Sequence, residues 1–505
     1  MPKPIKVIDI FAGPGGLGEG FAAIGRRSGE QRFDLSLSIE KDPVAHATLS
    51  LRALFRSYAH GEVPDAYYDY IRGDLGRQEL LQNAKIRENV VHAFNEARCA
   101  TLGPDAHSQT DRWIRDALGG DENWLLIGGP PCQAYSLAGR SRLRPVDAVK
   151  FEQDEKHFLY KEYLRIIKNF RPAVFVMENV KGLLSSTHGG SSMFDRILSD
   201  LRRPAPGVEY DIHSFVKSSS DDGLEPQDFI IKAEKFGIPQ ARHRVILLGV
   251  RSGFSAGKPA LLREADSEVT VADVIGMLPR IRSRLSRGKD SREAWAAAVA
   301  SAAETCIKRI KEEGDLLEVI QAAANRAQSL KSSGAEFIEG SFTPESRRLK
   351  QWYGDTRLGG LPQHEARSHM ESDLVRYLFA SSFAKVERSS PKLRHFPRWL
   401  LPKHKNMDFD AVPFLDRFRV QVKDAPSTTI VSHISKDGHY YIHHDPSQCR
   451  SLTVREAARL QTFPDNYFFE GNRTQQYHQV GNAVPPLLAF QMGEIVSGIF
   501  EAAGC

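Results

Sequence analysis

The sequence has few cysteines and no pattern among them. The five thiols stand far apart, at Cys99, Cys132, Cys306, Cys449 and Cys505. They form no Cys-x-x-Cys pair, and no cluster of histidines accompanies them at zinc spacing. A disulfide framework and a structural metal are therefore not expected, and this usage is typical of a reducing cytoplasm.

Long apolar runs are missing as well. The longest, such as Val245–Val250 and the start of the chain up to Phe11, are far shorter than the roughly 20 residues that cross a bilayer. The N-terminus has two lysines but no apolar stretch or small-residue cleavage site that would indicate a signal peptide. We therefore expect a cytoplasmic protein without a membrane span.

What the sequence does have is the composition of a globular protein. Its 505 residues are 41% hydrophobic and 26% charged, and the length predicts two or three domains. The net charge of +5 is mild but unevenly distributed. Residues 251–450 hold 32 Lys and Arg against 25 Asp and Glu, a balance of +7, whereas the remainder holds 36 against 38, a balance of −2.

The basic excess is greatest between Lys385 and Lys405. Seven Lys and Arg residues stand there against one acidic residue, with Phe396 and Trp399 among them. Such a segment predicts either a face that binds a polyanion or a solvated loop, and charge alone favours neither.

The first 250 residues alternate β-rich runs with helical patterns. Predicted strands are Ile5–Ile10, Phe33–Glu40, Trp124–Gly128, Ala173–Glu178 and Arg244–Val250. Predicted helices include Pro43–Leu54, Lys156–Asn169 and Met193–Leu201. This alternation predicts an α/β fold with a mostly parallel sheet and helices on both faces. Residues 76–122 are interpreted as a polar, helical insertion that decorates the fold.

The pattern changes after about residue 250. Residues 292–330 carry apolar residues at helical spacing and predict a long helix or a helical pair, while residues 333–450 are irregular. A last helix is expected after Pro485-Pro486, because prolines suit a first helical turn. We expect an α/β domain over 1–250, a second, smaller-cored domain over 251–471, and a C-terminal segment, 472–505, that completes the first domain.

A glycine turn follows the first predicted strand. Gly13, Gly15 and Gly18 satisfy Gly-x-Gly-x-x-Gly, and Glu40 ends the next strand. By itself this pattern suits a dinucleotide-binding oxidoreductase equally well, because several cofactors need close backbone approach and a carboxylate for the ribose hydroxyls. A purely structural glycine turn would have the same sequence.

Cys132 directly follows the predicted strand Trp124–Gly128, in the run Gly128-Gly129-Pro130-Pro131-Cys132-Gln133. Two glycines and two prolines predict a rigid turn that holds the thiol at the carboxyl edge of the sheet, where α/β folds bind ligands. A lone cysteine is usually a small buried residue, but this setting favours a nucleophile.

Two further segments carry polar residues next to apolar strands. Glu178 lies at the end of one strand, where a buried carboxylate needs either a partner or a proton. Gln240, Arg242 and Arg244 alternate in an extended segment, so their side chains share one side. A plain edge strand would show the same alternation.

Together these motifs resemble those of the DNA (cytosine-5) methyltransferase family over nearly the whole chain. The ordered set is Phe-x-Gly-x-Gly-Gly from Phe11, Pro-Cys-Gln around Cys132, Glu-Asn-Val from Glu178, Gln-x-Arg-x-Arg from Gln240, Leu-Thr-Val-Arg-Glu from Leu452, and Gln-Val-Gly-Asn from Gln479. Six motifs in this order are specific, whereas no single one would suffice. The resemblance implies a Rossmann-like, S-adenosylmethionine-dependent methyltransferase with a smaller, irregular target-recognition domain.

The resemblance implies that S-adenosyl-L-methionine binds at the glycine turn. The implied cofactor residues are Phe11, Gly13, Gly15, Gly16, Glu40, Asp74, Pro130 and Asn482. Asp74, expected to follow a strand, would accept a hydrogen bond from the adenine amino group, although its sequence alone favours a turn or a cap. Lys41 stands where the family often has an aromatic residue, so no role is assigned to it.

The resemblance also implies the chemistry. Cys132 would add to carbon 6 of cytosine so that carbon 5 can take a methyl group, and Glu178 would stabilise ring nitrogen 3. Arg244 would hold the carbonyl at carbon 2, while Arg242 would brace either the glutamate or the backbone of the flipped nucleotide. The target carbons are inaccessible in a stacked duplex, so the base must flip out.

Double-stranded DNA is the expected partner, and it would associate the protein with the nucleoid. The expected DNA contacts are Gln133, Ser136, Arg140 and Gln240, of which the first three lie in a segment similar to the family's mobile loop. A cognate restriction endonuclease and a monomeric state are also expected. The same chemistry on RNA is an alternative, against which the long basic region counts. A binding protein without catalysis is a further alternative, which the complete motif set contradicts.

Overall fold

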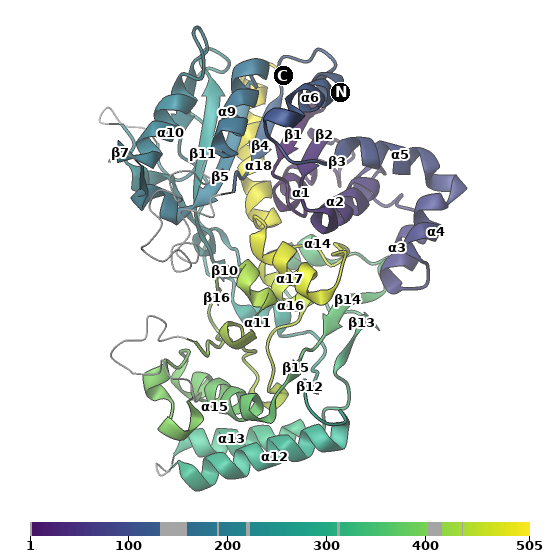
Figure 1. Cartoon of the computed structure of the whole chain (residues 1–505), viewed down its shortest axis with the longest axis vertical. Helices are drawn as coiled ribbons and strands as arrows, with labels where there is room; N and C mark the ends of the chain where they lie inside the picture. The colour runs from purple at the N-terminus through teal and green to yellow at the C-terminus, as the bar shows by residue number, and fades with distance from the viewer. Residues whose placement is uncertain are drawn as a thin grey trace.

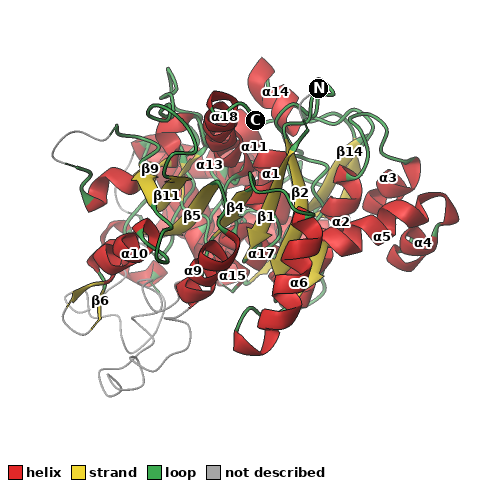
Figure 2. Ribbon diagram, turned by 90° about the horizontal axis from the view of Figure 1, so that it is seen from above, coloured by secondary structure: helices red, strands yellow, loops and turns green. Residues whose placement is uncertain are grey.

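The computed structural model describes residues 3–131, 159–188, 191–218, 223–310, 314–401, 417–436 and 438–505. A central sheet runs through the upper part of the molecule (Figures 1 and 2), in the strand order β3-β2-β1-β4-β5-β11-β8 with β9 beside β11. Its strands are β1 (Ile5–Ile10), β2 (Phe33–Glu40), β3 (Ala97–Cys99), β4 (Leu125–Gly128), β5 (Val174–Val180), β8 (Tyr210–His213), β9 (Ile230–Lys232) and β11 (His243–Arg251).

The sheet is mostly parallel, which confirms the predicted α/β class. Strands β3, β2, β1, β4 and β5 pair in parallel, whereas β11 runs antiparallel to β5, β8 and β9. Because the carboxyl ends of parallel strands meet at one edge, Glu40, Gly128 and Val180 end at the same edge. The turn after β1 leaves from that edge too.

Apolar side chains on both faces of the sheet create two cores. Val7 of β1 belongs to the core that includes α1 (Gly16–Ala22) and α18 (Pro486–Ala502). Its neighbour Ile8 belongs to the core on the opposite face. The helices of that core are α6 (His107–Leu118), α9 (Leu159–Phe170) and α10 (Met193–Arg202). Successive residues of a strand face opposite sides, so a sheet covered on both faces needs such continuous apolar strands.

The C-terminal helices pack into the first of these cores. The stretch Arg473–Ala502 is long and apolar enough to cross a bilayer by length and composition alone, yet 72% of its most apolar window is buried in the protein. Helix α18 lies so close to α1 that a Cβ atom on Gly20 would stand 2.4 Å from the Ala489 Cβ. Helix α18 is therefore a core helix.

The same core also takes in residues from the middle of the sequence. The contributing helices are α11 (Val271–Ile275), α14 (Arg347–Tyr353), α16 (Val454–Leu460) and α17 (Arg473–Asn482). Val274, Tyr353 and Ala457 are buried there together with Phe21. The hydrophobic packing thus crosses both boundaries expected for a separate unit over 251–471.

The insertion between β2 and β4 is helical, as predicted, and extends to the right in Figure 1. The helices between β2 and β4 are α2 (Pro43–Arg56), α3 (Asp65–Arg72), α4 (Arg77–Gln82), α5 (Arg87–Glu96) and α6. The insertion also supplies the short edge strand β3, which the sequence did not predict.

Three helices form a lower lobe beneath the sheet domain (Figure 1): α12 (Arg292–Arg309), α13 (Asp315–Ala327) and α15 (Glu371–Glu387). The first two are the predicted helical pair. Between the lobes, β10 (Gln240–Ala241) pairs with β16 (Ser427–Thr428). The other two-stranded pairs are β6 (Thr187–His188) with β7 (Ser191–Ser192), β12 (Arg284–Leu285) with β15 (Ser368–His369), and β13 (Gly334–Glu339) with β14 (Gly360–Glu365).

Candidate active site

The glycine turn after β1 is built from backbone conformations that side chains disfavour. Phe11, Gly13 and Gly15 have φ angles of 57°, 59° and 97°, in the left-handed region. A Cβ atom on Gly13 would meet nothing within 4 Å, so the turn is open there. A Cβ atom on Gly16 would instead stand 2.4 Å from the Val484 carbonyl oxygen. Gly13 therefore leaves room for a ligand, whereas Gly16 allows close packing.

Glu40 braces this turn from the end of β2. Its Oε2 accepts a hydrogen bond from the Gly13 backbone N–H at 2.8 Å, and its Oε1 accepts one from the Asp42 N–H at 2.7 Å. A carboxylate offers about four acceptor positions, so two remain for hydroxyl groups of a ligand. The position of Glu40 fits a ribose-binding residue.

The local structure expected for Asp74 is wrong. Asp74 follows helix α3, not a strand, and it is exposed between α3 and α4. Its backbone N–H donates to the Asp69 carbonyl oxygen at 2.8 Å, as in an ordinary helix end. Figure 1 shows this part of the insertion far to the right of the strand ends. The turn or cap interpretation describes Asp74 better than contact with adenine.

The strand end that lies next to Glu40 is that of β3, not a strand before Asp74. The Ala100 N–H donates to the Glu40 carbonyl oxygen at 3.0 Å, and the Cys99 thiol lies 3.8 Å from the Lys41 carbonyl oxygen. Burial, with the nearby Glu40 and Asp42 carboxylates, raises the pKa of the Cys99 thiol. Three strand residues between two helices give no alternation, so no sequence signal could have identified this segment.

The segment that leads to Cys132 begins against the Glu178 carboxylate. A Cβ atom on Gly129 would stand 2.9 Å from the Glu178 Oε2 atom, so a side chain there would displace the carboxylate. The next carbonyl, of the buried Pro130, accepts a hydrogen bond from the Asn179 side chain at 3.5 Å. The predicted nucleophile Cys132 and the predicted DNA contacts Gln133, Ser136 and Arg140 lie outside the described residues.

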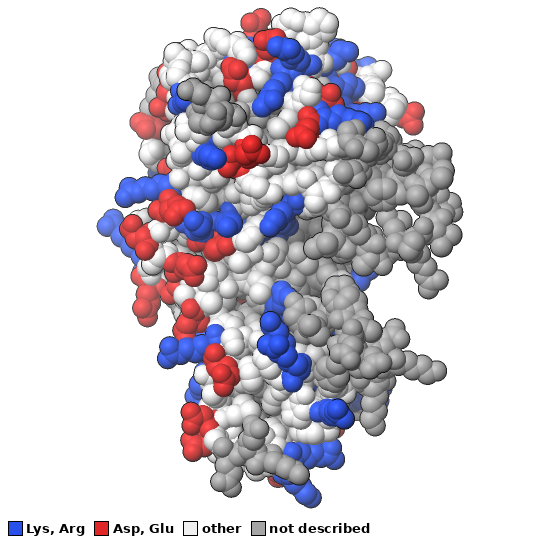
Figure 3. Space-filling model, turned by 90° about the vertical axis from the view of Figure 1, so that its left-hand side faces the viewer, with Lys and Arg blue, Asp and Glu red and all other residues white. Residues whose placement is uncertain are grey.

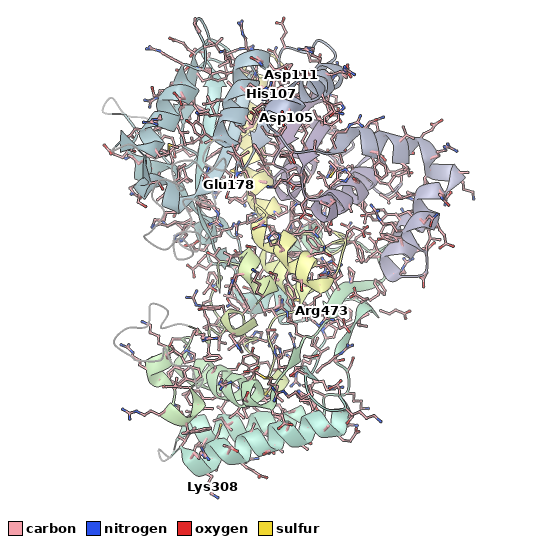
Figure 4. The ribbon with its side chains drawn as sticks, in the orientation of Figure 1. Asp105, His107, Asp111, Glu178, Lys308 and Arg473 are labelled. Carbon is pink, nitrogen blue, oxygen red and sulfur yellow. The ribbon has the colours of Figure 1, made fainter. Side chains whose placement is uncertain are left out.

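Glu178 and Arg244 form an ion pair on neighbouring antiparallel strands. The Arg244 Nε atom lies 3.0 Å from Glu178 Oε1, and the two side chains are 16% and 15% exposed. Burial lowers the pKa of Arg244, while the charge of Glu178 opposes the shift. The partner predicted for a carboxylate in this strand therefore exists. Figure 4 shows Glu178 toward the lower edge of the sheet, on the side of the lower lobe.

One expectation was that Arg242 would brace Glu178. In the structure its side chain bonds backbone carbonyl oxygens instead. Its Nη1 donates to the Ile430 carbonyl oxygen at 2.9 Å and to the Gly481 carbonyl oxygen at 3.4 Å. The side chain is 3% exposed, and burial, followed by the nearby charge of Arg244, lowers its pKa to about 9. Arg242 thus joins three segments of the chain beside the site, and Arg244 takes the role of brace.

Gln240 cannot contact DNA as predicted, because it is fully buried. Its Nε2 donates to the Leu460 carbonyl oxygen and the Gln461 Oε1 at 3.0 and 2.9 Å, and its Oε1 accepts from the Ile430 N–H at 2.8 Å. The alternation of Gln240, Arg242 and Arg244 correctly indicated one shared side. That side faces the protein interior at Gln240.

Asn482 lies at the end of α17, close to the glycine turn in the fold. Two residues later, the Val484 carbonyl meets Gly16. The Asn482 side chain is exposed, and its Nδ2 lies 3.3 Å from the His478 Nδ1. Gly481 allows α17 to approach Val431 and Ser432, since a Cβ atom there would stand 2.3 Å from the Ser432 nitrogen. The last motif therefore packs between the turn and the β16 segment.

Comparison with known proteins places this site in a family. The family model for C-5 cytosine-specific DNA methylases matches residues 82–497. The type II methyltransferase M.Bpa9945I of Bacillus paralicheniformis is 32% identical, over 98% of this chain and 99% of that protein. The type II methyltransferases M.AgeI of Thalassovita gelatinovora and M.DdeI of Desulfomicrobium norvegicum are 27% and 24% identical, over 97% and 98% of this chain and 99% and 89% of theirs. The chain belongs to the family of C-5 cytosine-specific DNA methylases.

Proposed function

We propose that the chain transfers a methyl group to carbon 5 of a flipped-out cytosine in a specific duplex DNA sequence, through a covalent adduct with Cys132. The observation that carries the proposal is the Glu178–Arg244 pair, which lies against Gly129 at the start of the Cys132 segment. A carboxylate and a guanidinium at the sheet edge, with the Cys132 thiol next in the sequence to the segment that reaches them, are the groups that cytosine addition chemistry requires.

We propose that S-adenosyl-L-methionine binds at the same sheet edge, beside the glycine turn after β1. Gly13 leaves open space at the turn, and the Glu40 carboxylate retains acceptor positions for ribose hydroxyls. Phe11 lies in the turn itself, and we propose that Pro130 after β4 and Asn482 at the end of α17 complete the site. When bound, this cofactor supplies an electrophilic methyl group.

The residues of the chain prepare the base for transfer. The Cys132 sulfur forms a bond to carbon 6, and the ring π electrons move toward nitrogen 3 and carbon 5. Glu178 gives a proton or a hydrogen bond to nitrogen 3, while Arg244 orients the carboxylate and holds the carbonyl at carbon 2. Once carbon 5 carries its methyl group, a water molecule acting as a base removes the carbon 5 proton, and the freed electron pair expels the Cys132 thiolate. The nitrogen 3 proton returns to Glu178, which leaves neutral 5-methylcytosine.

The names of the relatives support a role in restriction–modification. All three are called type II methyltransferases, so we propose that the product protects DNA from a cognate endonuclease that cuts the same sequence. Flipping the base out of the duplex costs a few kcal/mol, which contacts to the opened DNA must offset. We propose that the enzyme acts as a monomer in the cytoplasm, where it would meet the nucleoid.

Bisulfite sequencing of DNA from an expressing host tests the proposal. We expect one short sequence to be protected from conversion in the host with the native chain, and none in a host expressing Cys132→Ala. A duplex with 5-fluorocytosine at the identified position should form a stable covalent complex with the native chain alone, since no proton can leave carbon 5. Methylation of RNA without methylation of DNA would overturn the proposal in favour of an RNA enzyme.

A further inference from the structure

We propose that five exposed basic residues on the lower lobe form a surface that binds phosphates of duplex DNA beside the flipped cytosine. This basic shoulder consists of Lys385, Arg388, Lys392, Arg394 and Arg398. The inference rests on the proposed function, because it needs DNA as the substrate. It goes further by identifying a second DNA contact outside the reaction site.

The aromatic residues of this segment are structural anchors, which separates them from the charges. Phe396 is 4% exposed and packs against Phe379 and Phe418, with ring centroids 5.0 and 5.4 Å apart. Trp399 contacts the same core, where the Arg309 guanidinium lies 5.3 Å from its ring centroid. The rings therefore fix the segment to the lobe, while its basic side chains lie on the surface.

The backbone of the shoulder is held by specific hydrogen bonds. Arg388 ends α15 with a φ of 51°, which turns the chain sharply. The Lys392 N–H donates to the His395 ring at 3.2 Å, and the Arg376 side chain donates to the Leu400 carbonyl oxygen at 2.8 Å. A fixed platform loses less conformational entropy on binding than a free loop does. This argues against the solvated-loop interpretation.

The charges of the shoulder are unneutralised within the described part of the chain. None of the five side chains forms an ion pair with another described residue, and Glu387 is the one acidic residue between Lys385 and Arg398. Figure 3 shows basic side chains along the middle of the lower lobe, while acidic ones gather toward its left-hand margin. Charge complementarity thus favours a polyanion on this face.

A short chain of contacts fixes the shoulder relative to the active site. The Val420 N–H donates to the hydroxyl of Ser390, within the shoulder segment, at 2.9 Å. Val420 is followed in the chain by Gln421. The buried Gln421 Oε1 accepts from the Thr428 N–H and hydroxyl at 2.9 and 3.1 Å. Thr428 lies in β16, which pairs with β10.

Strand β10 leads within three residues to Arg244, so the reacting cytosine and the shoulder keep a constant separation. Contacts to phosphate fix the register of a protein on a duplex without reading its sequence. The shoulder would therefore orient the duplex and leave the choice of sequence to other residues.

The test measures DNA affinity against salt concentration for the full chain and a triple variant, Lys392→Gln, Arg394→Gln and Arg398→Gln. Each lost phosphate contact lowers the slope of log K against log salt by about 0.9, so we expect the slope to fall by about 2 to 3. KM for the target DNA should rise at least tenfold with kcat unchanged. The affinity of the triple variant should fall by the same factor for target and unrelated duplexes. The single variant Arg394→Gln should lower the slope by about 0.9.

A charge-matched control comes from α12 and α13, the helices at the lower end of the lobe in Figure 1. The control variant removes three exposed positive charges by Lys308→Gln in α12, Arg326→Gln in α13 and Lys331→Gln shortly after α13. Figure 4 shows Lys308 at the lower end of the lobe. An equal loss of slope in this control, or an unchanged slope in the shoulder variants, would overturn the inference. A native chain that methylates no DNA would instead refute the proposed function.

Discussion

Two kinds of charged residue contrast in this protein. At the sheet edge, Glu178, Arg244 and Arg242 are largely buried, and each has a defined partner. On the basic shoulder, Lys392 and Arg398 are exposed and have no ion-pair partner among the described residues. Burial strengthens electrostatic interactions and fixes geometry, whereas exposed charge acts over a longer range and is screened by salt. We therefore expect the reaction rate and the affinity for DNA to depend on separate sets of charges.

The largest expected effect comes from breaking the buried pair. Glu178→Gln should lower kcat by about 10²- to 10⁴-fold, because the amide cannot deliver a proton to nitrogen 3. Arg244→Gln should also lower kcat strongly, since the carboxylate then loses its orienting partner. In a double-mutant cycle, we expect the single-turnover rate of the double variant to fall by much less than the product of the two single-variant reductions. Strict additivity would show that the two residues act independently.

Arg242 provides the next comparison, between a buried and an exposed cation. Arg242→Met leaves the Ile430 and Gly481 carbonyl oxygens without their donor, so the free energy of unfolding should fall by about 2 to 4 kcal/mol. Arg394→Met on the shoulder should change it by less than about 0.5 kcal/mol. Urea denaturation of both variants measures the difference. Equal stabilities would contradict a structural role for Arg242.

Burial also predicts the pH dependence of stability. Burial lowers the pKa of His364 to about 4, from an ordinary value of 6.5, and the ring bonds the Thr453 hydroxyl and the Pro279 carbonyl. The unfolded chain therefore binds the proton first, so stability is full above pH 6.5 and is lost as the pH falls toward 4. The loss from this residue should reach about 2 kcal/mol at pH 5.

Urea denaturation at pH 7 and pH 5 tests that prediction against a His364→Gln variant. The variant should lose less stability between the two pH values than the native chain does. An identical loss in both proteins would assign the pH dependence to other groups, such as His369, whose pKa burial lowers to about 3.

The sequence predicted most of the sheet because each strand is an apolar run between turn residues. β1 and β2 begin and end where predicted. The site was predicted where motif residues lie near the ends of apolar strands, as at Glu178. The errors at Asp74 and Gln240 have another origin. Whether a turn lies at the sheet edge, or an alternating side chain faces inward, depends on contacts between segments far apart in the sequence.

Asp74 gives the smallest expected effect and the sharpest contrast with Glu40. Glu40→Gln removes one of two acceptor oxygens that hold the Gly13 and Asp42 N–H groups, so the Kd for S-adenosyl-L-methionine should rise about tenfold. Asp74→Asn removes an exposed charge at a helix end, and its Kd should stay within about twofold of the native value. Isothermal titration calorimetry measures both without DNA or turnover. A tenfold weaker Asp74→Asn variant would mean that the α3–α4 turn closes over the adenine when the cofactor binds.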